Sequence, residues 1–394
     1  MNALRDDFFK YQAQTTPSPL AMEISHAEGS YIFDIHQKKY LDFVAGVSAC
    51  SLGHRPPSVV AAVKEQLEKY WHVMVYGEYI QRPSVELTKL LAANLPESLS
   101  CTYLTNSGTE AIEGAMKLAK RITGRSQFVA AKNAYHGSTQ GAMSIMGFEE
   151  RKSAYRPLLP GIEFITFNCD ADLEKIDTQT AAVVLETIQG GAGFILPKNH
   201  YLKKVKKRCE EVGALLILDE IQPGLGRTGT LFGFETFGIV PDILVMGKGL
   251  GGGFPIGAFS TSPTLMKQLQ TDPILGHITT FGGHPVIASA ALATLKRITE
   301  GGLMKETLQK EQLFRQLLIH DHIQEIRGIG LMLALILPNA ETANQLVLRC
   351  MEKGLILFWL LFEKKAVRIT PPLTLSENEI REGCKIILSV LDEL

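Results

Sequence analysis

Two stretches in the middle of the chain decide the fold class. Residues 215–229 read LLILDEIQPGLGRTG, and residues 242–257 read DILVMGKGLGGGFPIG. Each contains a short, continuously apolar run that leads into a glycine-containing turn, as is typical of strands buried on both faces of a parallel sheet. The turns that follow would lie at the carboxyl edge of the sheet, where open α/β sheets bind their ligands.

The same alternation of apolar runs and helical patterns extends outward from these stretches. Strands are predicted at residues 128–131, 162–167, 182–186, 215–218 and 243–246. Between them, residues 109–122 and 201–212 place their apolar residues on one helical face. This order predicts an α/β domain with a mainly parallel sheet flanked by helices.

The pattern changes after about residue 285. A helix is predicted at 285–299, strands near 331–337 and 367–369, and a C-terminal helix from residue 377. Residues 31–43 read as a hairpin, YIFDI and YLDF around the polar turn HQKK. We therefore expect an N-terminal segment 1–48 that packs with the small domain, a large domain 49–285, and a small α+β domain 286–394.

Composition excludes several classes of function. The chain has 394 residues, a formal net charge of −1 and 45% hydrophobic residues, which favour neither a nucleic-acid nor a membrane partner. Its apolar runs are shorter than the roughly 20 residues of a membrane helix. The basic run 203–208 is most simply the solvated face of a helix. The six scattered cysteines have no disulfide or zinc spacing, so we expect a soluble, cytoplasmic protein without a metal site.

Lys248 is the first candidate for chemistry. It follows the apolar run 243–246 and stands among closely spaced glycines. Burial at such a place lowers the pKa of an amine and makes it nucleophilic towards carbonyl groups. The glycines would let a flat ligand approach the backbone closely. An isolated lysine in a glycine-rich loop is more often a simple surface residue, so Lys248 needs support from other positions.

Two further features give that support. Asp219 ends an apolar strand, where a carboxylate is costly unless it has a partner. It either caps a helix, pairs with an arginine such as Arg227, or binds the protonated ring nitrogen of a pyridine cofactor. Residues 105–110 (TNSGTE) precede a helix and are either an ordinary N-cap or an anion site built from free N–H groups.

The order of these features along the chain is more specific than any one of them. A phosphate cradle is followed by an aromatic-histidine pair (Tyr135, His136), a strand-end aspartate (Asp219) and a lysine after the next strand (Lys248). This is the arrangement that pyridoxal 5′-phosphate (PLP) requires. The sequence therefore predicts a PLP site.

The chain resembles the class-III (ω-amino) aminotransferases of the acetylornithine/ornithine type over nearly its whole length. The resemblance rests on NSGTEAIEGAMKLA, YHGS, ETIQG, LLILDEIQPGLGRTG, PDILVMGKGLGGGFPIGA, TTFGGHP and RITPPL. It implies the PLP-dependent transferase fold type I (aspartate aminotransferase-like), with a mainly parallel large domain and a smaller α+β domain. It also implies a homodimer with shared active sites.

The resemblance assigns roles to individual residues. Lys248 matches the lysine that binds PLP as a Schiff base and moves the proton, and Asp219 matches the partner of the ring nitrogen. Arg368 matches an arginine that binds a substrate carboxylate. The remaining matches are to cofactor-binding residues: Ser107, Gly108 and Thr109 in the phosphate cup, Tyr135 and His136 against the ring, Glu186 in the pocket wall, Gln222 near the phenolic oxygen, and Thr280 reaching the phosphate in the neighbouring subunit.

Three departures bear on the substrate. Ser138 stands where this type has an arginine for a substrate carboxylate. Residues 189–193 read QGGAG instead of QGEGG, so Gly191 replaces an acid that can pair with the carboxylate-binding arginine. The segment 355–368 before Arg368 is unusually bulky, and Trp359 either lines the pocket or, more simply, packs in the core.

These observations predict an aminotransferase that moves an ω-amino group from an acylornithine-like donor, N-acetylornithine first, to 2-oxoglutarate by a ping-pong mechanism. Such an activity belongs to amino-acid metabolism, in arginine biosynthesis for the acetylated donor. Other ω-amino donors (ornithine, 4-aminobutyrate, lysine) and a PLP aminomutase or racemase remain alternatives. A catalytically silent PLP-binding protein is a further one.

Overall fold

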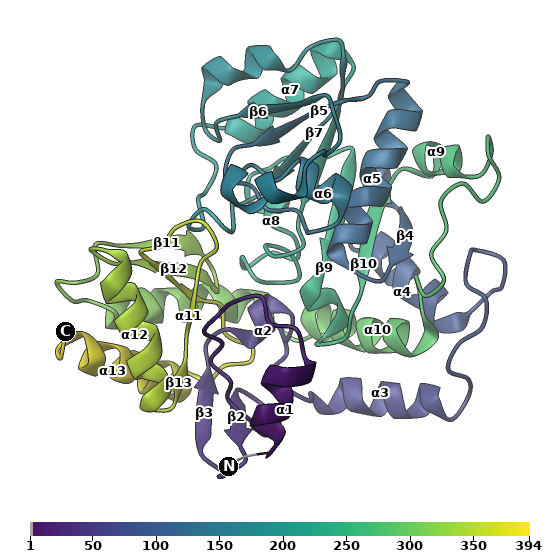
Figure 1. Cartoon of the computed structure of the whole chain (residues 1–394). Coiled ribbons are helices and arrows are strands. Elements are labelled where there is room, and N and C mark those ends of the chain that lie inside the picture. Colours follow the sequence, from purple (N-terminus) through teal and green to yellow (C-terminus); the bar gives the residue numbers. More distant parts are fainter. Residues whose placement is uncertain (1–2) are drawn as a thin grey trace.

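The computed structural model describes residues 3–394 and is built around a seven-stranded sheet (Figure 1). Its strands, in spatial order, are β4 (Cys101–Thr105), β10 (Gly257–Thr261), β9 (Ile243–Gly247), β8 (Leu215–Asp219), β7 (Thr180–Glu186), β5 (Gln127–Ala131) and β6 (Ile162–Ile165). The pairs from β9 to β6 are parallel, and only β10 runs antiparallel to both of its neighbours. The predicted mainly parallel sheet is confirmed.

Alternate residues of each central strand face two different apolar clusters. In β8, Leu216 and Leu218 join one cluster with α7 (Tyr201–Val212), whereas Ile217 joins the other with α5 (Gly108–Thr123). Both faces of the sheet are therefore covered by helices, which explains why these strands read as continuous apolar runs. The strands and helices predicted in this region are all present, with bounds that differ by one or two residues.

Three helices pack together beside the large sheet. They are α3 (Pro57–Leu67), α4 (Arg82–Ala93) and α10 (Pro285–Glu300). Buried residues of α10, among them Ala288, Leu295 and Ile298, belong to the same apolar cluster as one face of the sheet. The predicted domain boundary at residue 285 thus falls at the start of a helix that packs with the large sheet, and the division into domains stays a prediction.

The C-terminal part forms a smaller α+β unit. Its antiparallel sheet has the order β11 (Glu325–Ile329), β12 (Met332–Ile336), β15 (Ala366–Ile369) and β14 (Phe358–Trp359). The helices α11 (Leu303–Leu317), α12 (Ala340–Glu352) and α13 (Glu377–Leu391) contribute to the same apolar cluster as this sheet. The predicted elements after residue 300 are confirmed.

The N-terminal strands lie beside this smaller unit in Figure 1. β1 (Ile24–Glu28), β2 (Tyr31–Asp34) and β3 (Lys39–Asp42) are antiparallel neighbours, and β3 pairs in parallel with β13 (Leu355–Ile356). The predicted hairpin is therefore present, and its backbone bonds join it to the C-terminal part. The remaining short helices are α1 (Ala3–Tyr11), α2 (Ala45–Ser48), α6 (Gln140–Ser144), α8 (Gly233–Thr236) and α9 (Pro263–Met266). Within residues 3–394, every helix is too short or too polar to span a bilayer.

Candidate active site

The carboxyl ends of three adjacent parallel strands build the centre of the site. β7 ends at Glu186, β8 ends at Asp219, and the register of the sheet pairs these two residues directly. β9 ends at Gly247, so Lys248 follows on the next strand. Three residues far apart in the sequence are thus brought together because parallel strands deliver their ends to one edge.

Lys248 is half-buried and has an unusual backbone conformation. Its φ is 41°, which is uncommon for a residue with a side chain and is found where surrounding structure imposes it. Burial lowers the pKa of its amine; Arg368 acts in the same direction, whereas Asp219 and Glu186 oppose it. The neutral, nucleophilic form of the amine is therefore favoured compared with an exposed lysine.

Asp219 is held by two partners. Its Oδ2 lies 2.8 Å from Nδ1 of His136, and its Oδ1 accepts a hydrogen bond of 2.9 Å from the backbone N–H of Ile221. Burial alone would lower the pKa of His136, but the hydrogen bond to Asp219 together with the charges of Asp219 and Glu186 outweighs it, and the pKa is raised. Arg227, the other partner considered for Asp219, instead donates to the carbonyls of Leu331 and Pro371 and to Ser51.

Glu186 occupies the other side of Asp219. Its carboxylate accepts hydrogen bonds from the backbone N–H groups of Gly190 (2.9 Å) and Tyr135 (3.3 Å). Burial nevertheless raises its pKa to about 7. A β-carbon built on Gly190 would lie 2.9 Å from Oε1 of Gln222, so Gln222 borders the same space.

The amino end of α5 supplies the predicted phosphate cup. Ser107 is the N-cap, and its hydroxyl accepts a hydrogen bond from the N–H of Glu110. A β-carbon on Gly108 would lie 2.6 Å from Ile221, and Gly108 itself lies close to Gly247 beside Lys248. The ordinary cap is therefore present, at a helix end close to the lysine. The role of Ser107, Gly108 and Thr109 in binding phosphate stays a prediction.

Tyr135 and Ser138 lie at the edge of the site. Tyr135 is half-buried, and its hydroxyl is 3.2 Å from the hydroxyl of the exposed Ser138. Position 138 thus offers a hydroxyl where a guanidinium was expected. Thr280 is exposed in the segment between residues 270 and 284, and no contact in the described part of the chain joins it to Lys248.

Arg368 is a buried guanidinium without an acid partner. It lies in β15 with 5% of its surface exposed, and its Nε donates to the carbonyl of Trp359 over 3.2 Å. Its Nη1 has no hydrogen-bond partner among residues 3–394, and burial lowers its pKa to about 10. A buried guanidinium without an acid partner lowers the stability of the fold unless a ligand pairs with it. The side chain of Trp359 packs against the core of the C-terminal unit.

Phe362 was not anticipated from the sequence. A β-carbon on Gly191 would lie 2.8 Å from its ring, and its backbone N–H donates to the carbonyl of Gly191. The ring stacks on Phe148 with centroids 4.6 Å apart. The Phe362 ring therefore fills the space beside Gly191, the position at which this type of enzyme carries an acid.

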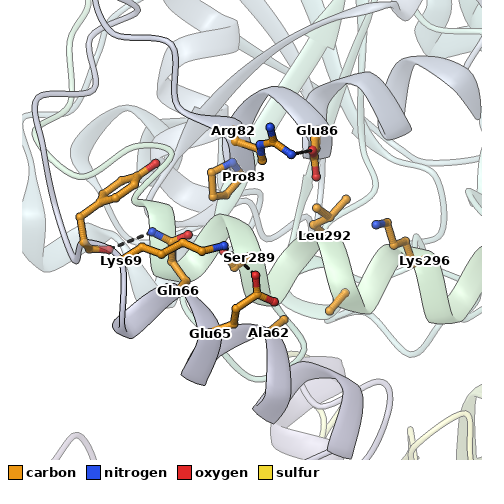
Figure 2. Close-up of a pocket in the computed structure, with 12 residues that line it drawn as sticks. Ala62, Glu65, Gln66, Lys69, Arg82, Pro83, Glu86, Ser289, Leu292 and Lys296 are labelled. Atoms are coloured by element: carbon orange, nitrogen blue, oxygen red, sulfur yellow. Dashed lines mark hydrogen bonds and ion pairs between the residues drawn. The ribbon is translucent and has the colours of Figure 1, made fainter.

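A separate surface pocket lies between α3, α4 and α10, as Figure 2 shows. Four of its charged residues form two ion pairs: Lys69 with Glu65 over 2.6 Å, and Arg82 with Glu86 over 3.7 Å. None of the strand-end residues described above lines it. It contributes nothing to the chemistry at Lys248.

This fold and this strand-end site define a PLP-dependent enzyme of fold type I. The family model for class-III aminotransferases matches residues 11–391. Acetylornithine aminotransferase from Caldanaerobacter subterraneus subsp. tengcongensis is 38% identical over 379 residues, which cover 93% of this chain and 94% of that protein. The chain belongs to the class-III aminotransferases.

Solved structures of other aminotransferases are similar to this chain. The ornithine aminotransferase from Toxoplasma gondii, crystallised with partial occupancy of PLP, superimposes with a TM-score of 0.91 at 30% identity and covers 99% of this chain and 95% of its own. The omega transaminase from Pseudomonas jessenii in complex with PMP gives a TM-score of 0.93 at 28% identity, with 99% and 98% covered.

PLP is the cofactor of this enzyme, and the residues present fit it. A half-buried lysine with a lowered pKa lies near the buried carboxylate of Asp219 at a strand end. Nε2 of His136 is buried without a partner among residues 3–394, and glycines line the close approach of α5 to the turn at Lys248.

Proposed function

We propose that this aminotransferase moves an ω-amino group from an acylornithine-like donor, N-acetylornithine first, to 2-oxoglutarate by a ping-pong mechanism. One observation carries the proposal: Arg368, whose Nη1 has no hydrogen-bond partner among residues 3–394, lies near enough to the amine of Lys248 to lower its pKa. A reacting carbon and a carboxylate can therefore be held in one site.

PLP, when bound, draws electrons away from the carbon that carries the amino group and makes its proton labile. In the proposal, Asp219 faces the ring nitrogen and keeps it protonated, with His136 holding the carboxylate in place through the 2.8 Å bond. Lys248 binds the cofactor at rest. Once the donor has displaced it, its neutral amine would take the proton from the donor carbon that carries the amino group and pass it to the cofactor carbon bonded to that group.

Other residues of the site would contact the rest of the cofactor. Glu186 and Gln222 border the space next to Asp219, and Tyr135 lies at its edge. The free N–H groups at the start of α5, with Ser107 and Thr109, are suited to a phosphate because a helix amino end attracts anions. Arg368 would bind the carboxylate of the substrate through two N–H groups.

A homodimer with shared sites is part of the proposal. Thr280 is exposed in a segment that also exposes apolar side chains, with 76% of Ile274, 50% of Leu275 and 53% of Phe281 accessible. Clustered exposed apolar residues mark surfaces that bind another protein. Thr280 would then reach the phosphate bound by the second subunit. The cytoplasmic location stays a prediction.

The test is a donor screen with purified PLP-loaded protein and 2-oxoglutarate, with glutamate and the aldehyde product both measured. We expect N-acetylornithine to give the highest kcat/KM among N-acetylornithine, ornithine, 4-aminobutyrate and lysine. A clear preference for ornithine would contradict the acylornithine proposal. Amino migration or epimerisation without any keto acid would support an aminomutase or racemase instead.

A further inference from the structure

Arg151 lies at the edge of the site and was not anticipated as a functional residue. It ends the short turn Glu149–Arg151 that follows α6. Its Nη2 donates to the carbonyl of Leu361 over 3.2 Å, and its guanidinium lies 5.8 Å from the centre of the Phe362 ring. The large domain and the loop before β15 are thus joined by an arginine.

The charge of Arg151 is unpaired. The neighbouring Glu149 forms ion pairs with Arg156 (2.8 Å) and Lys152 (3.9 Å). None of the ion pairs within residues 3–394 includes Arg151. Its guanidinium is exposed and has donors to spare beyond the one bonded to Leu361, because the group carries five N–H bonds.

Arg151 and Arg368 are held by the same short segment. Arg368 donates to the carbonyl of Trp359, and Arg151 donates to the carbonyl of Leu361, two residues further on. Two residues of chain span roughly 7 Å at most. Arg368 is the inner group, close to Lys248, because it lowers the pKa of that lysine. Arg151 is the outer group, farther from Lys248 and next to Phe362.

Two guanidinium groups bonded to carbonyls of one short segment suit a substrate with two carboxylates. The terminal carbons of a five-carbon dicarboxylate are separated by four C–C bonds of about 1.5 Å, or roughly 5 Å when extended. The Phe362 ring lies near both the guanidinium of Arg151 and Gly191, where it would contact the apolar middle of such a chain. Position 138, with its serine, supplies no charge for the outer carboxylate.

We propose that Arg151 is the outer carboxylate-binding residue of this site, acting with Arg368 to bind five-carbon dicarboxylates of the 2-oxoglutarate and glutamate class. The inference rests on the proposed function, in which 2-oxoglutarate is the acceptor.

The experiment measures binding of two non-reacting compounds to the PLP-loaded protein by calorimetry. Glutarate has a carboxylate at each end, and pentanoate has the same five carbons with one carboxylate. The wild type is compared with Arg151→Gln and with Arg156→Gln. The second variant removes a guanidinium from the same loop, but one that is already paired with Glu149. Such a surface pair contributes little to stability, so this control should fold normally.

We expect the wild type and Arg156→Gln to bind glutarate about five- to tenfold more tightly than pentanoate. Arg151→Gln should bind both compounds equally, with an unchanged affinity for pentanoate. A preference for glutarate that survives in Arg151→Gln, or one that is absent from the wild type, would overturn the inference. Because neither compound reacts, this result is independent of the donor screen, which alone decides whether the proposed transamination occurs.

Discussion

Nδ1 of His136 lies 2.8 Å from Oδ2 of Asp219, and both side chains are buried. The two residues are 83 positions apart in the chain, yet the end of β8 and the loop after β5 bring them into direct contact. A hydrogen bond to an ionised carboxylate is roughly twice as strong as one between neutral groups. The pair therefore fixes the direction in which Asp219 presents its charge to the cofactor.

Replacing Asp219 by Asn should remove that charge while keeping the shape of the side chain. We expect kcat to fall by at least about a hundredfold, as when a single electrostatic contact to a reacting group is lost. Turnover at saturating PLP measures the effect. Asp242→Asn is the control, because Asp242 precedes β9 at the opposite edge of the sheet and pairs with Lys206. Near-normal turnover in Asp219→Asn would refute the role given to Asp219.

Lys248→Ala should abolish turnover while PLP still binds without a covalent bond. Borohydride reduces the bond between the cofactor and its lysine, so that the cofactor stays attached to the protein. Mass spectrometry then detects the added mass. The wild type and the nearby exposed variant Lys132→Ala should gain the mass of the reduced cofactor. The Lys248→Ala protein should not. Cofactor fixed to the protein in that variant would show that another lysine bears it.

Arg368→Gln should weaken the productive binding of carboxylate substrates. A lost hydrogen bond to a charged group costs about 2 kcal/mol, or roughly thirtyfold. We expect that loss in kcat/KM for 2-oxoglutarate, with little change in the rate at which pentylamine, which has no carboxylate, aminates the bound cofactor. Arg349→Gln, on α12, should match the wild type in both assays. Equal losses with both substrates would indicate a structural role for Arg368.

Because the pKa of Glu186 is raised, the free energy of unfolding of the cofactor-free protein should depend on pH. Burial raises its pKa from 4.5 to about 7, so between these values the folded state binds more protons than the unfolded state. The free energy of unfolding then falls as pH rises, by on the order of 2–3 kcal/mol between pH 5 and pH 8.

Urea unfolding at pH 5, 6, 7 and 8 measures this effect. Glu186→Gln should match the wild type at pH 5 and become progressively more stable than it towards pH 8. The exposed variant Glu150→Gln should show a constant difference across the range. A Glu186→Gln protein that gains no relative stability with rising pH would contradict this account of the carboxylate.

Sequence patterns predicted the strands whose residues are continuously apolar. The strands β5, β7, β8 and β9 are continuous apolar runs, and both of their faces are covered by helices. The strands β4 and β10 were not predicted, because they carry polar residues. Thr102 and Ser260 bond to each other across these strands over 2.7 Å, a compensation visible only once the strands are paired.

The residues of the candidate site also fall into two groups: those predicted from the sequence and those found only in the structure. Lys248 and Asp219 could be proposed because one follows and the other ends a recognisable apolar strand. Glu186 could be proposed only from the resemblance to class-III aminotransferases. Arg151 and Phe362 could not. The bond from Arg151 to Leu361 spans 210 residues, and neither residue stands in a pattern that distinguishes it from ordinary surface or core.

The central claim is that Lys248 carries PLP and that an ω-amino donor aminates it. The most direct test is the absorption spectrum of the purified protein with PLP, recorded before and after N-acetylornithine is added without any keto acid. We predict that the band of the lysine-bound cofactor fades while the band of the aminated cofactor appears. A lysine-bound band that N-acetylornithine leaves unchanged would contradict the proposed donor, and the absence of that band even with PLP supplied would contradict the role of Lys248.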